Sequence, residues 1–339
     1  MKYLLFVFFS GLIITLINFF FQKKKIFLDI KQKSYHKKFT GHKHVPFAGG
    51  IFLLFSIFFL SDLNLYFLSI LLIIFLIGFF SDLFILNSIK VRFLFQIIFI
   101  ILFIILADLK ISQTRIFLID QFLTNNLFNI FFICLCILIV INGSNFIDGV
   151  NINLLSYYII IYIILLLLSK NQSIDVNIKN LDLFLTTLII IFILNFSQKL
   201  YMGDSGAYLI GFYTSINLIN FYNDNLAISS FFIVLLLWYP AFENFFSIVR
   251  KKNLNRSPLK PDNKHLHHLI FLFLKKNKLV TKYENTATGL IINVYNLFVL
   301  IIGFNYFYHS QILSMLVLLN IFIYCFVYYK LSTYITKGM

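Results

Sequence analysis

The chain has 339 residues, of which 60% are hydrophobic and only 12% charged, and its mean hydropathy is +0.90. Water-soluble domains of this length do not reach such values, so a soluble enzyme or binding domain is excluded and the bilayer is the expected solvent. The net charge of +15 could suggest a nucleic-acid partner, but membrane proteins collect such charge on their cytoplasmic loops, so we expect no nucleic-acid binding.

Apolar runs long enough to cross a membrane recur along the chain. The first, residues 4–21, contains no charge and ends at three lysines. A cleavable signal peptide is the alternative, but no small-x-small cleavage site follows, which favours a retained anchor. Further spans are predicted at 48–60, 65–80, 93–107, 127–142, 153–169, 181–195, 207–220, 227–240, 288–308 and 311–329. We therefore expect an all-α, polytopic transmembrane helical bundle of eleven spans, or ten, forming a single integral membrane domain over residues 1–339.

Alternate loops differ strongly in lysine and arginine content. The loops 22–46, 81–92, 143–152, 196–206 and 241–287, with the C-terminal tail, hold 23 of the 28 basic residues. The other side holds five, namely Lys2, Lys110, Arg115, Lys170 and Lys179. The positive-inside rule therefore places the basic loops and the C-terminus in the cytoplasm and the N-terminus outside.

Polar motifs stand at the predicted ends of four spans. They are residues 78–82, 142–151, 202–206 preceded by Asn195, and 261–268. Charged groups in hydrocarbon cost roughly 2.5–3.5 kcal/mol, so polar residues at helix ends require an explanation. All four motifs fall on the cytoplasmic side of a topology that was derived without them, which indicates a common site.

Asp204 lies between two glycines where the eighth predicted span begins. A helix that starts there directs unpaired N–H groups at an anion, and a neighbouring carboxylate suggests Mg²⁺ bridging to phosphate. The structural alternative is that Asp204 only caps the helix, and on local sequence alone this alternative is preferred.

Two further carboxylates accompany it. Asp148 and Asn145 are three residues apart and share a helix face, and Gly149 allows the chain to break after them. Helix capping is again the alternative for both, and Asp82 has the weakest local signal. Jointly, the three aspartates could surround one metal and one phosphate.

Three of the seven histidines fall within four positions, at His265, His267 and His268. On a helix His265 and His268 would share a face and His267 would point elsewhere, which disfavours one zinc site and favours contacts to phosphate or sugar. The lysines and arginines that precede them are expected to form a solvated basic loop.

Together these motifs resemble the polyprenyl-phosphate N-acetylhexosamine-1-phosphate transferases, glycosyltransferase family 4, which are relatives of the phospho-N-acetylmuramoyl-pentapeptide transferase. The matching segments are HKHVPFAGG at 42–50, GFFSD at 78–82, NFIDGVN at 145–151 and MGDSG at 202–206. HLHH at 265–268 looks like the histidine motif of the branch that uses UDP-N-acetylglucosamine. The resemblance covers residues from about 31 to 269.

The resemblance implies an enzyme in which polyprenyl phosphate, such as undecaprenyl phosphate, attacks a UDP-sugar and UMP leaves. It implies Asp82, Asp148 and Asp204 as catalytic residues, with Asp82 orienting the lipid phosphate. It implies Mg²⁺, with Mn²⁺ as the alternative ion, held by Asp204 and Asn145. The same resemblance assigns nucleotide and pyrophosphate binding to Asn145, Asp148 and Asn195, and contacts with phosphate or sugar to His265, His267 and His268.

Two departures and two alternatives qualify this hypothesis. The family usually has two adjacent aspartates where this chain has Ser81 and Asp82, and often Asp-Gly where it has Asn151 and Ile152. A catalytically weak binding homologue is therefore one alternative. A transporter of lipid-linked sugars is another, but its binding groups should lie near the bilayer midplane rather than at one set of helix ends. The sugar, the glycan pathway (O-antigen, capsule or wall polymer) and a homodimer remain open from sequence.

Overall fold

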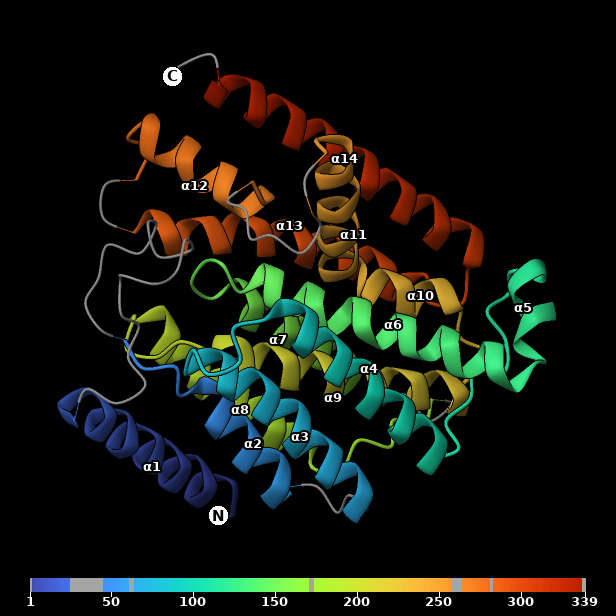
Figure 1. Cartoon of the computed structure of the whole chain (residues 1–339), viewed down its shortest axis with the longest axis horizontal. Coiled ribbons are helices and arrows are strands. Elements are labelled where there is room, and N and C mark those ends of the chain that lie inside the picture. The colour runs from blue at the N-terminus through green and yellow to red at the C-terminus, as the bar shows by residue number, and fades with distance from the viewer. Residues whose placement is uncertain are drawn as a thin grey trace.

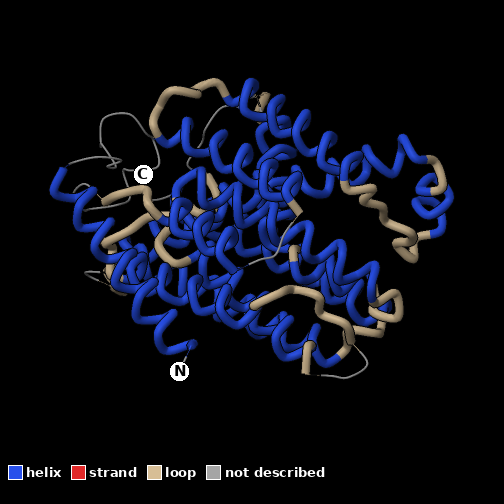
Figure 2. The backbone as a smooth tube through the Cα atoms, turned by 90° about the horizontal axis from the view of Figure 1, so that it is seen from below, coloured by secondary structure: helices blue, strands red, loops and turns tan. Residues whose placement is uncertain are grey.

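The computed structural model describes residues 2–24, 45–60, 64–170, 174–255, 257, 264–280 and 283–336. The described chain is helical, with short connections between helices, and contains no strand (Figures 1 and 2). Its helices are α1 (Lys2–Lys24), α2 (Gly49–Leu60), α3 (Leu65–Asp82), α4 (Ile89–Leu106), α5 (Phe117–Leu123), α6 (Asn126–Ile147), α7 (Asn153–Leu168), α8 (Leu181–Phe196), α9 (Gly203–Asp224), α10 (Ser230–Leu236), α11 (Trp238–Asn253), α12 (Leu266–Lys276), α13 (Glu284–Asn305) and α14 (Ser310–Thr336).

A helix stands at each of the eleven predicted spans, but several helices continue past the apolar run. α6 extends to Ile147 and α9 begins at Gly203, so the polar motifs lie inside the last or first helical turns. α4 begins at Ile89 because Ser88 is its N-cap, accepting a hydrogen bond from the Val91 N–H at 3.5 Å. The predicted span began at residue 93, so the start at Ile89 places Arg92 in the first turn of the helix instead of in the preceding loop.

The ninth predicted span, 227–240, is not one straight helix. α10 ends at Leu236 and α11 follows after a bend of 73°. Pro240 lies in the first turn of α11. A proline is tolerated there because the N–H that it lacks has no helical partner in a first turn, so this position suits the start of a new helix and not the continuation of α10. The predicted loop 241–287 therefore contains most of α11 and all of α12, and basic residues lie in the last turn of each of these helices.

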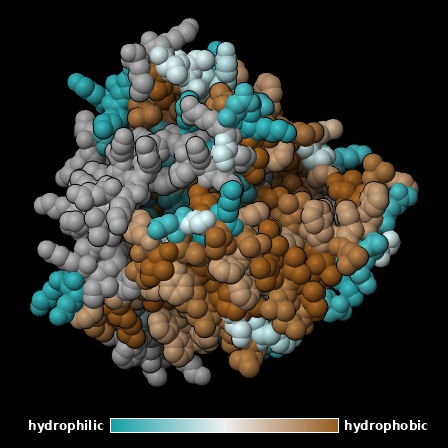
Figure 3. Space-filling model, in the orientation of Figure 1, coloured by the Kyte–Doolittle hydropathy of each residue, from teal (hydrophilic) through white to brown (hydrophobic). Residues whose placement is uncertain are grey.

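Five described helices are long and apolar enough to cross a membrane: α3, α4, α6, α13 and α14. The bent pair α10–α11 would make a sixth, and α2, α7 and α8 are apolar but shorter. Apolar side chains cover much of the middle and right of the face in Figure 3, and hydrophilic ones gather toward the left and along the right edge. The chain is therefore a helical membrane protein, while eleven spans and the orientation stay predictions.

α9 is the central helix, packed against α2, α3 and α6 (Figure 1). It is buried on nearly all sides, as expected for a helix without an amphipathic face. Glycines allow its first turn to approach its neighbours: a Cβ on Gly50 of α2 would lie 2.5 Å from the Gly206 N, and one on Gly78 of α3 would lie 2.5 Å from the Ser205 Cα. The start of α9 is thus fixed by backbone contact with two other helices.

Candidate active site

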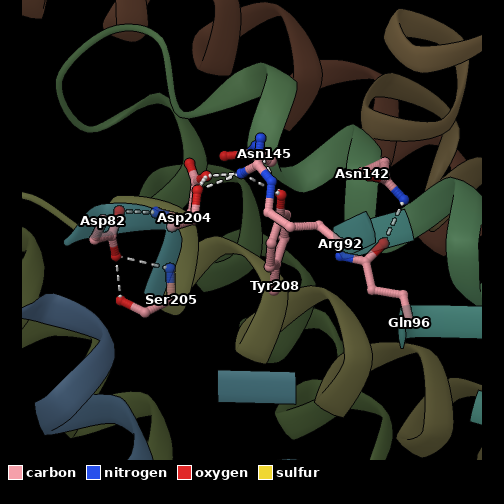
Figure 4. A network of polar contacts seen from close by, with 9 residues as sticks. Asp82, Arg92, Gln96, Asn142, Asn145, Asp204, Ser205 and Tyr208 are labelled. Atoms are coloured by element: carbon pink, nitrogen blue, oxygen red, sulfur yellow. Dashed lines mark hydrogen bonds and ion pairs between the residues drawn. The ribbon is translucent and has the colours of Figure 1, made fainter. Parts of the chain in front are cut away.

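Asp82, the last residue of α3, directs its carboxylate at the start of α9 (Figure 4). Its Oδ1 accepts a hydrogen bond from the Asp204 N–H at 2.8 Å, and its Oδ2 accepts from the Ser205 N–H and hydroxyl at 3.0 and 2.7 Å. These backbone N–H groups are the ones expected to face a phosphate. The anion at this helix start is therefore the protein's own Asp82.

Gly203 is required where Asp82 meets α9. Its φ is +71°, a left-handed conformation that disfavours other residues, and a Cβ there would lie 2.6 Å from the Asp82 Oδ2. Both the backbone conformation and the space therefore select glycine. The glycine preceding Asp204 serves the contact between two helices.

Asp204 lies in the first turn of α9 and is bound by Arg92 from α4. The Arg92 Nη1 is 2.5 Å from the Asp204 Oδ2, and the Ser81 hydroxyl donates to the same oxygen at 2.6 Å. Arg92 also donates to the Ser81 hydroxyl oxygen and, at 3.3 Å, to that of Tyr208. The side chains of Arg92 and Asp204 are 13% and 28% exposed, so the pair is shielded but reachable from outside.

Asp148 and Asn145, at the end of α6, face the same network. Asp148 is half-buried, and its pKa is raised well above its usual value by burial, then by the charges of Asp204 and Asp82, while a backbone hydrogen bond from Gly203 lowers it in part. The Asn145 amide donates to the Tyr208 hydroxyl at 3.5 Å. The structure thus brings Asp82, Asp148 and Asp204 together with Asn145.

Asn195 is placed differently. It is 4% exposed, its Oδ1 accepts from the Ile152 N–H at 2.6 Å, and its Nδ2 donates to the Leu200 carbonyl at 2.9 Å. Ile152 has φ +61°, which is unusual for a β-branched residue and strained. Asn195 therefore stabilises the strained connection between α6 and α7, and its amide is occupied by backbone groups.

The three histidines form one cluster beside this connection. His267 and His268 are fully buried, and the ring centroids lie 4.2 Å apart for His267–His268, 5.5 Å for His265–His267 and 5.7 Å for His265–His268. The expectation that His267 points away was wrong, because His265 precedes α12 in extended backbone and does not follow the helical face. A Cβ on Gly149 would overlap the His267 Nε2, so the cluster lies directly against the residue after Asp148.

Comparison with known proteins identifies the family to which part of the chain is similar. A family model described as Glycosyl transferase family 4 matches residues 64–222. This segment belongs to glycosyl transferase family 4. The family indicated by the sequence motifs is thereby confirmed over the part of the chain that carries all three aspartates.

Curated relatives point the same way. An undecaprenyl-phosphate alpha-N-acetylglucosaminyl 1-phosphate transferase of Thermotoga maritima is 35% identical over 71 residues, which are 21% of this chain and 23% of that protein. A probable undecaprenyl-phosphate N-acetylglucosaminyl 1-phosphate transferase of Bacillus subtilis is 34% identical over 77 residues, 22% of this chain and 21% of that protein. A decaprenyl-phosphate N-acetylglucosaminephosphotransferase of Mycolicibacterium smegmatis is 40% identical over 82 residues, 21% of this chain and 20% of that protein. The matched stretches thus span about a fifth of these relatives.

Within the family 4 segment, sequence reasoning did not identify Arg92, Ser81 or Tyr208 as members of the network. Arg92 was counted only as a basic loop residue, although a cation at the edge of an apolar run was a signal for it. Ser81 was noted only as a departure from paired aspartates. In the structure its hydroxyl is a donor to Asp204, a contact that a second ionised carboxylate could not make.

The donor set is compatible with Mg²⁺. Among the described residues, no group of three or more His, Cys, Asp or Glu side chains could hold a metal ion. Mg²⁺ needs fewer, because it takes one or two carboxylates together with water and phosphate oxygens. In the described part of the chain the contacts to the Asp204 side chain are made on Oδ2, which leaves Oδ1 available as a ligand to an ion.

A cavity of about 550 Å³ lies elsewhere, at the opposite end of α9. Its lining includes Asp108, Lys110, Asn217, Asn220 and Asp224. None of the residues of the carboxylate network or the histidine cluster borders it. The candidate active site is therefore the converging helix ends and not this cavity.

Proposed function

We propose that this chain transfers an N-acetylhexosamine 1-phosphate from a UDP-sugar to a polyprenyl phosphate at the cytoplasmic face of a bacterial inner membrane. An oxygen of the lipid phosphate attacks the sugar-bearing phosphorus, the bond between the two phosphates of the UDP-sugar breaks, and UMP leaves. The product is a polyprenyl-diphospho-sugar, which would initiate a cell-envelope glycan. The names of the relatives support this reaction, and UDP-N-acetylglucosamine is the first substrate to test.

The observation that carries the proposal is the convergence of Asp82, Asp148, Asp204 and Arg92 at the ends of four helices. The reaction brings together two phosphate-bearing substrates, one dissolved and one in lipid, and a site at helix ends is accessible to both. Catalysis of this kind consists mainly of positioning and charge neutralisation. We therefore assign the chain's side chains to holding and orienting these phosphates.

Asp204 and Asn145, with Asp148 beside them, would hold Mg²⁺ or Mn²⁺. When bound, the ion would act as a Lewis acid on the pyrophosphate and stabilise the departing UMP. Arg92, whose guanidinium binds Asp204, would also bind a phosphate oxygen of the substrates. Asp82 fixes the start of α9, so we assign it to positioning Asp204 as well as to orienting the lipid phosphate.

The histidine cluster is proposed to contact the sugar or phosphate of the nucleotide-sugar, because it lies against Gly149 beside Asp148. Asn195 is proposed as a positioning residue for the 148–152 connection. The transporter alternative is disfavoured because the three aspartates of the candidate site lie at helix ends and not in the middle of a span.

The test is UMP release from UDP-N-acetylglucosamine by purified protein with undecaprenyl phosphate, with and without Mg²⁺, beside Asp204→Asn. We expect metal-dependent release in the wild type and a loss of about 100-fold or more in the variant, comparable to losing one transition-state contact. Folded wild-type protein that releases no UMP from any UDP-N-acetylhexosamine tried would contradict the proposal. Activity that appears only after Ser81→Asp would instead support a catalytically weak homologue.

A further inference from the structure

Glu243 is a buried carboxylate outside the aspartate network. It lies on α11 and is 0% exposed, although burying a charge without partners is strongly unfavourable. Its Oε1 is 2.8 Å from the His265 Nδ1, and its Oε2 accepts a hydrogen bond from the Tyr324 hydroxyl of α14 at 2.7 Å. Both carboxylate oxygens are thus directed by partners from two other parts of the chain.

The contact with His265 leads to the candidate site. A carboxylate accepts hydrogen bonds, so the His265 Nδ1 carries the proton and the ring is fixed in one orientation. That ring lies 5.1 Å from the Phe146 ring at the end of α6 and stacks on His267 with an interplanar angle of 6°. His267 in turn packs against Gly149, the neighbour of Asp148.

We propose that Glu243 is a positioning residue, which sets the orientation of His265 and through it the histidine cluster against the 148–149 backbone. The inference rests on the proposed function, because it gives the cluster a nucleotide-sugar to contact. Tyr324 supports Glu243 from the C-terminal helix. Replacing the partner that orients a metal-ligating histidine commonly changes affinity or activity by about 10–100-fold, and we expect an effect of the same order for the orientation of His265.

The experiment compares Glu243→Gln with wild type in two measurements, the Kd of UDP-N-acetylglucosamine and the rate of UMP release. Glutamine keeps the size of the side chain but replaces one accepting oxygen by a donor. We expect the Kd and KM for UDP-N-acetylglucosamine to rise about tenfold, while the KM for undecaprenyl phosphate stays within about twofold. General damage to the fold would impair both substrates alike.

A double-mutant cycle tests whether Glu243 acts through His265. Once His265→Asn is in place, adding Glu243→Gln should cause no further loss, whereas independent effects would multiply. Tyr324→Phe removes one hydrogen bond to Glu243 and leaves its charge, so it serves if Glu243→Gln does not fold. Tyr329→Phe is the control, because Tyr329 lies on the same helix and is 67% exposed.

The outcomes separate the two proposals. Wild-type protein that binds the UDP-sugar but releases no UMP would overturn the proposed reaction, and the Kd ratio would still test the role of Glu243. An active wild type with an unchanged Glu243→Gln, or multiplicative losses in the cycle, would overturn the role of Glu243 alone. Wild-type protein that does not bind the UDP-sugar would overturn both.

Discussion

At the scale of single residues, the candidate site balances three carboxylates against one guanidinium. Arg92 binds Asp204 directly, and Ser81 adds a hydrogen-bond donor to the same oxygen. The Asp82 carboxylate is stabilised differently, by hydrogen bonds from the N–H groups at the start of α9. Because Ser81 stands where the family usually has a second aspartate, the site carries one negative charge fewer. Its hydroxyl can also donate the hydrogen bond to Asp204, which an ionised aspartate could not.

Replacing Arg92 should show how much its ion pair with Asp204 contributes to stability. We expect Arg92→Gln to destabilise the protein by about 2 kcal/mol, less than the roughly 3–5 kcal/mol typical of a broken buried pair, because Asp204 keeps 28% exposure. Mg²⁺ should restore more stability to the variant than to wild type, since the ion replaces the lost charge. Thermal unfolding in detergent with and without Mg²⁺ measures both effects. Lys90→Gln, an exposed cation two residues earlier, is the control and should change neither.

Asn195 distinguishes a positioning role from direct substrate binding. Asn195→Ala leaves the buried N–H of Ile152 and the carbonyl of Leu200 without their partner, so we expect a loss of about 2–4 kcal/mol of unfolding free energy. Chemical denaturation in detergent measures it, with Asn305→Ala at an exposed position as the control. Unchanged stability with a raised KM for the UDP-sugar would show that Asn195 binds substrate instead.

At the scale of helices, glycine contacts hold α2, α3 and α9 together beneath the carboxylates. In α3 a Cβ on Gly78 would lie 2.5 Å from both N and Cα of Ser205, which is backbone and cannot rotate away. Gly78→Ala should therefore push α3 from α9, lengthen the hydrogen bonds between Asp82 and Ser205, and cost about 1–3 kcal/mol.

The matched control is Gly11→Ala in α1, where an added Cβ meets nothing within 4 Å. We expect it to be neutral or to stabilise α1 slightly, because alanine is the better helix former. UMP release and the unfolding temperature should both fall in Gly78→Ala and stay near the wild-type values in Gly11→Ala. Equal behaviour of both variants would show that the contact between α3 and α9 does not control the site.

Contacts between distant helices separate what the sequence could not predict from the local features that it could. Apolar run length located a helix at every predicted span, and the charge pattern drew attention to the helix ends that carry Asp82, Asp148 and Asp204. Pairing between distant helices has no local signal, so neither the Arg92–Asp204 ion pair nor the Asp82 contact with α9 was predicted. The bend between α10 and α11 was also missed, because both halves are apolar enough to be read as one run. His267 was misplaced because a helical face was assumed for a residue beside extended backbone.

At the scale of the whole molecule, the reaction requires the carboxylate end of the bundle to face the cytoplasm. α4 is long enough to connect the two sides: its 18 residues span about 27 Å, with the exposed Asn87 just before it and the exposed Lys110 just beyond it. The charge distribution predicts that the Asn87 end is cytoplasmic. We expect a membrane-impermeant maleimide to label Lys110→Cys but not Asn87→Cys in intact spheroplasts.

The background for this measurement replaces the three native cysteines, Cys134, Cys136 and Cys325, with serine. Both engineered cysteines should react after the membrane is permeabilised, which controls for their exposure. Labelling of Asn87→Cys alone in intact spheroplasts would contradict the orientation, and it would place Asp82, Asp148 and Asp204 on the outer side. A cytoplasmic nucleotide-sugar could not reach them there, so this single result would overturn the proposed transfer reaction even if the fold is unchanged.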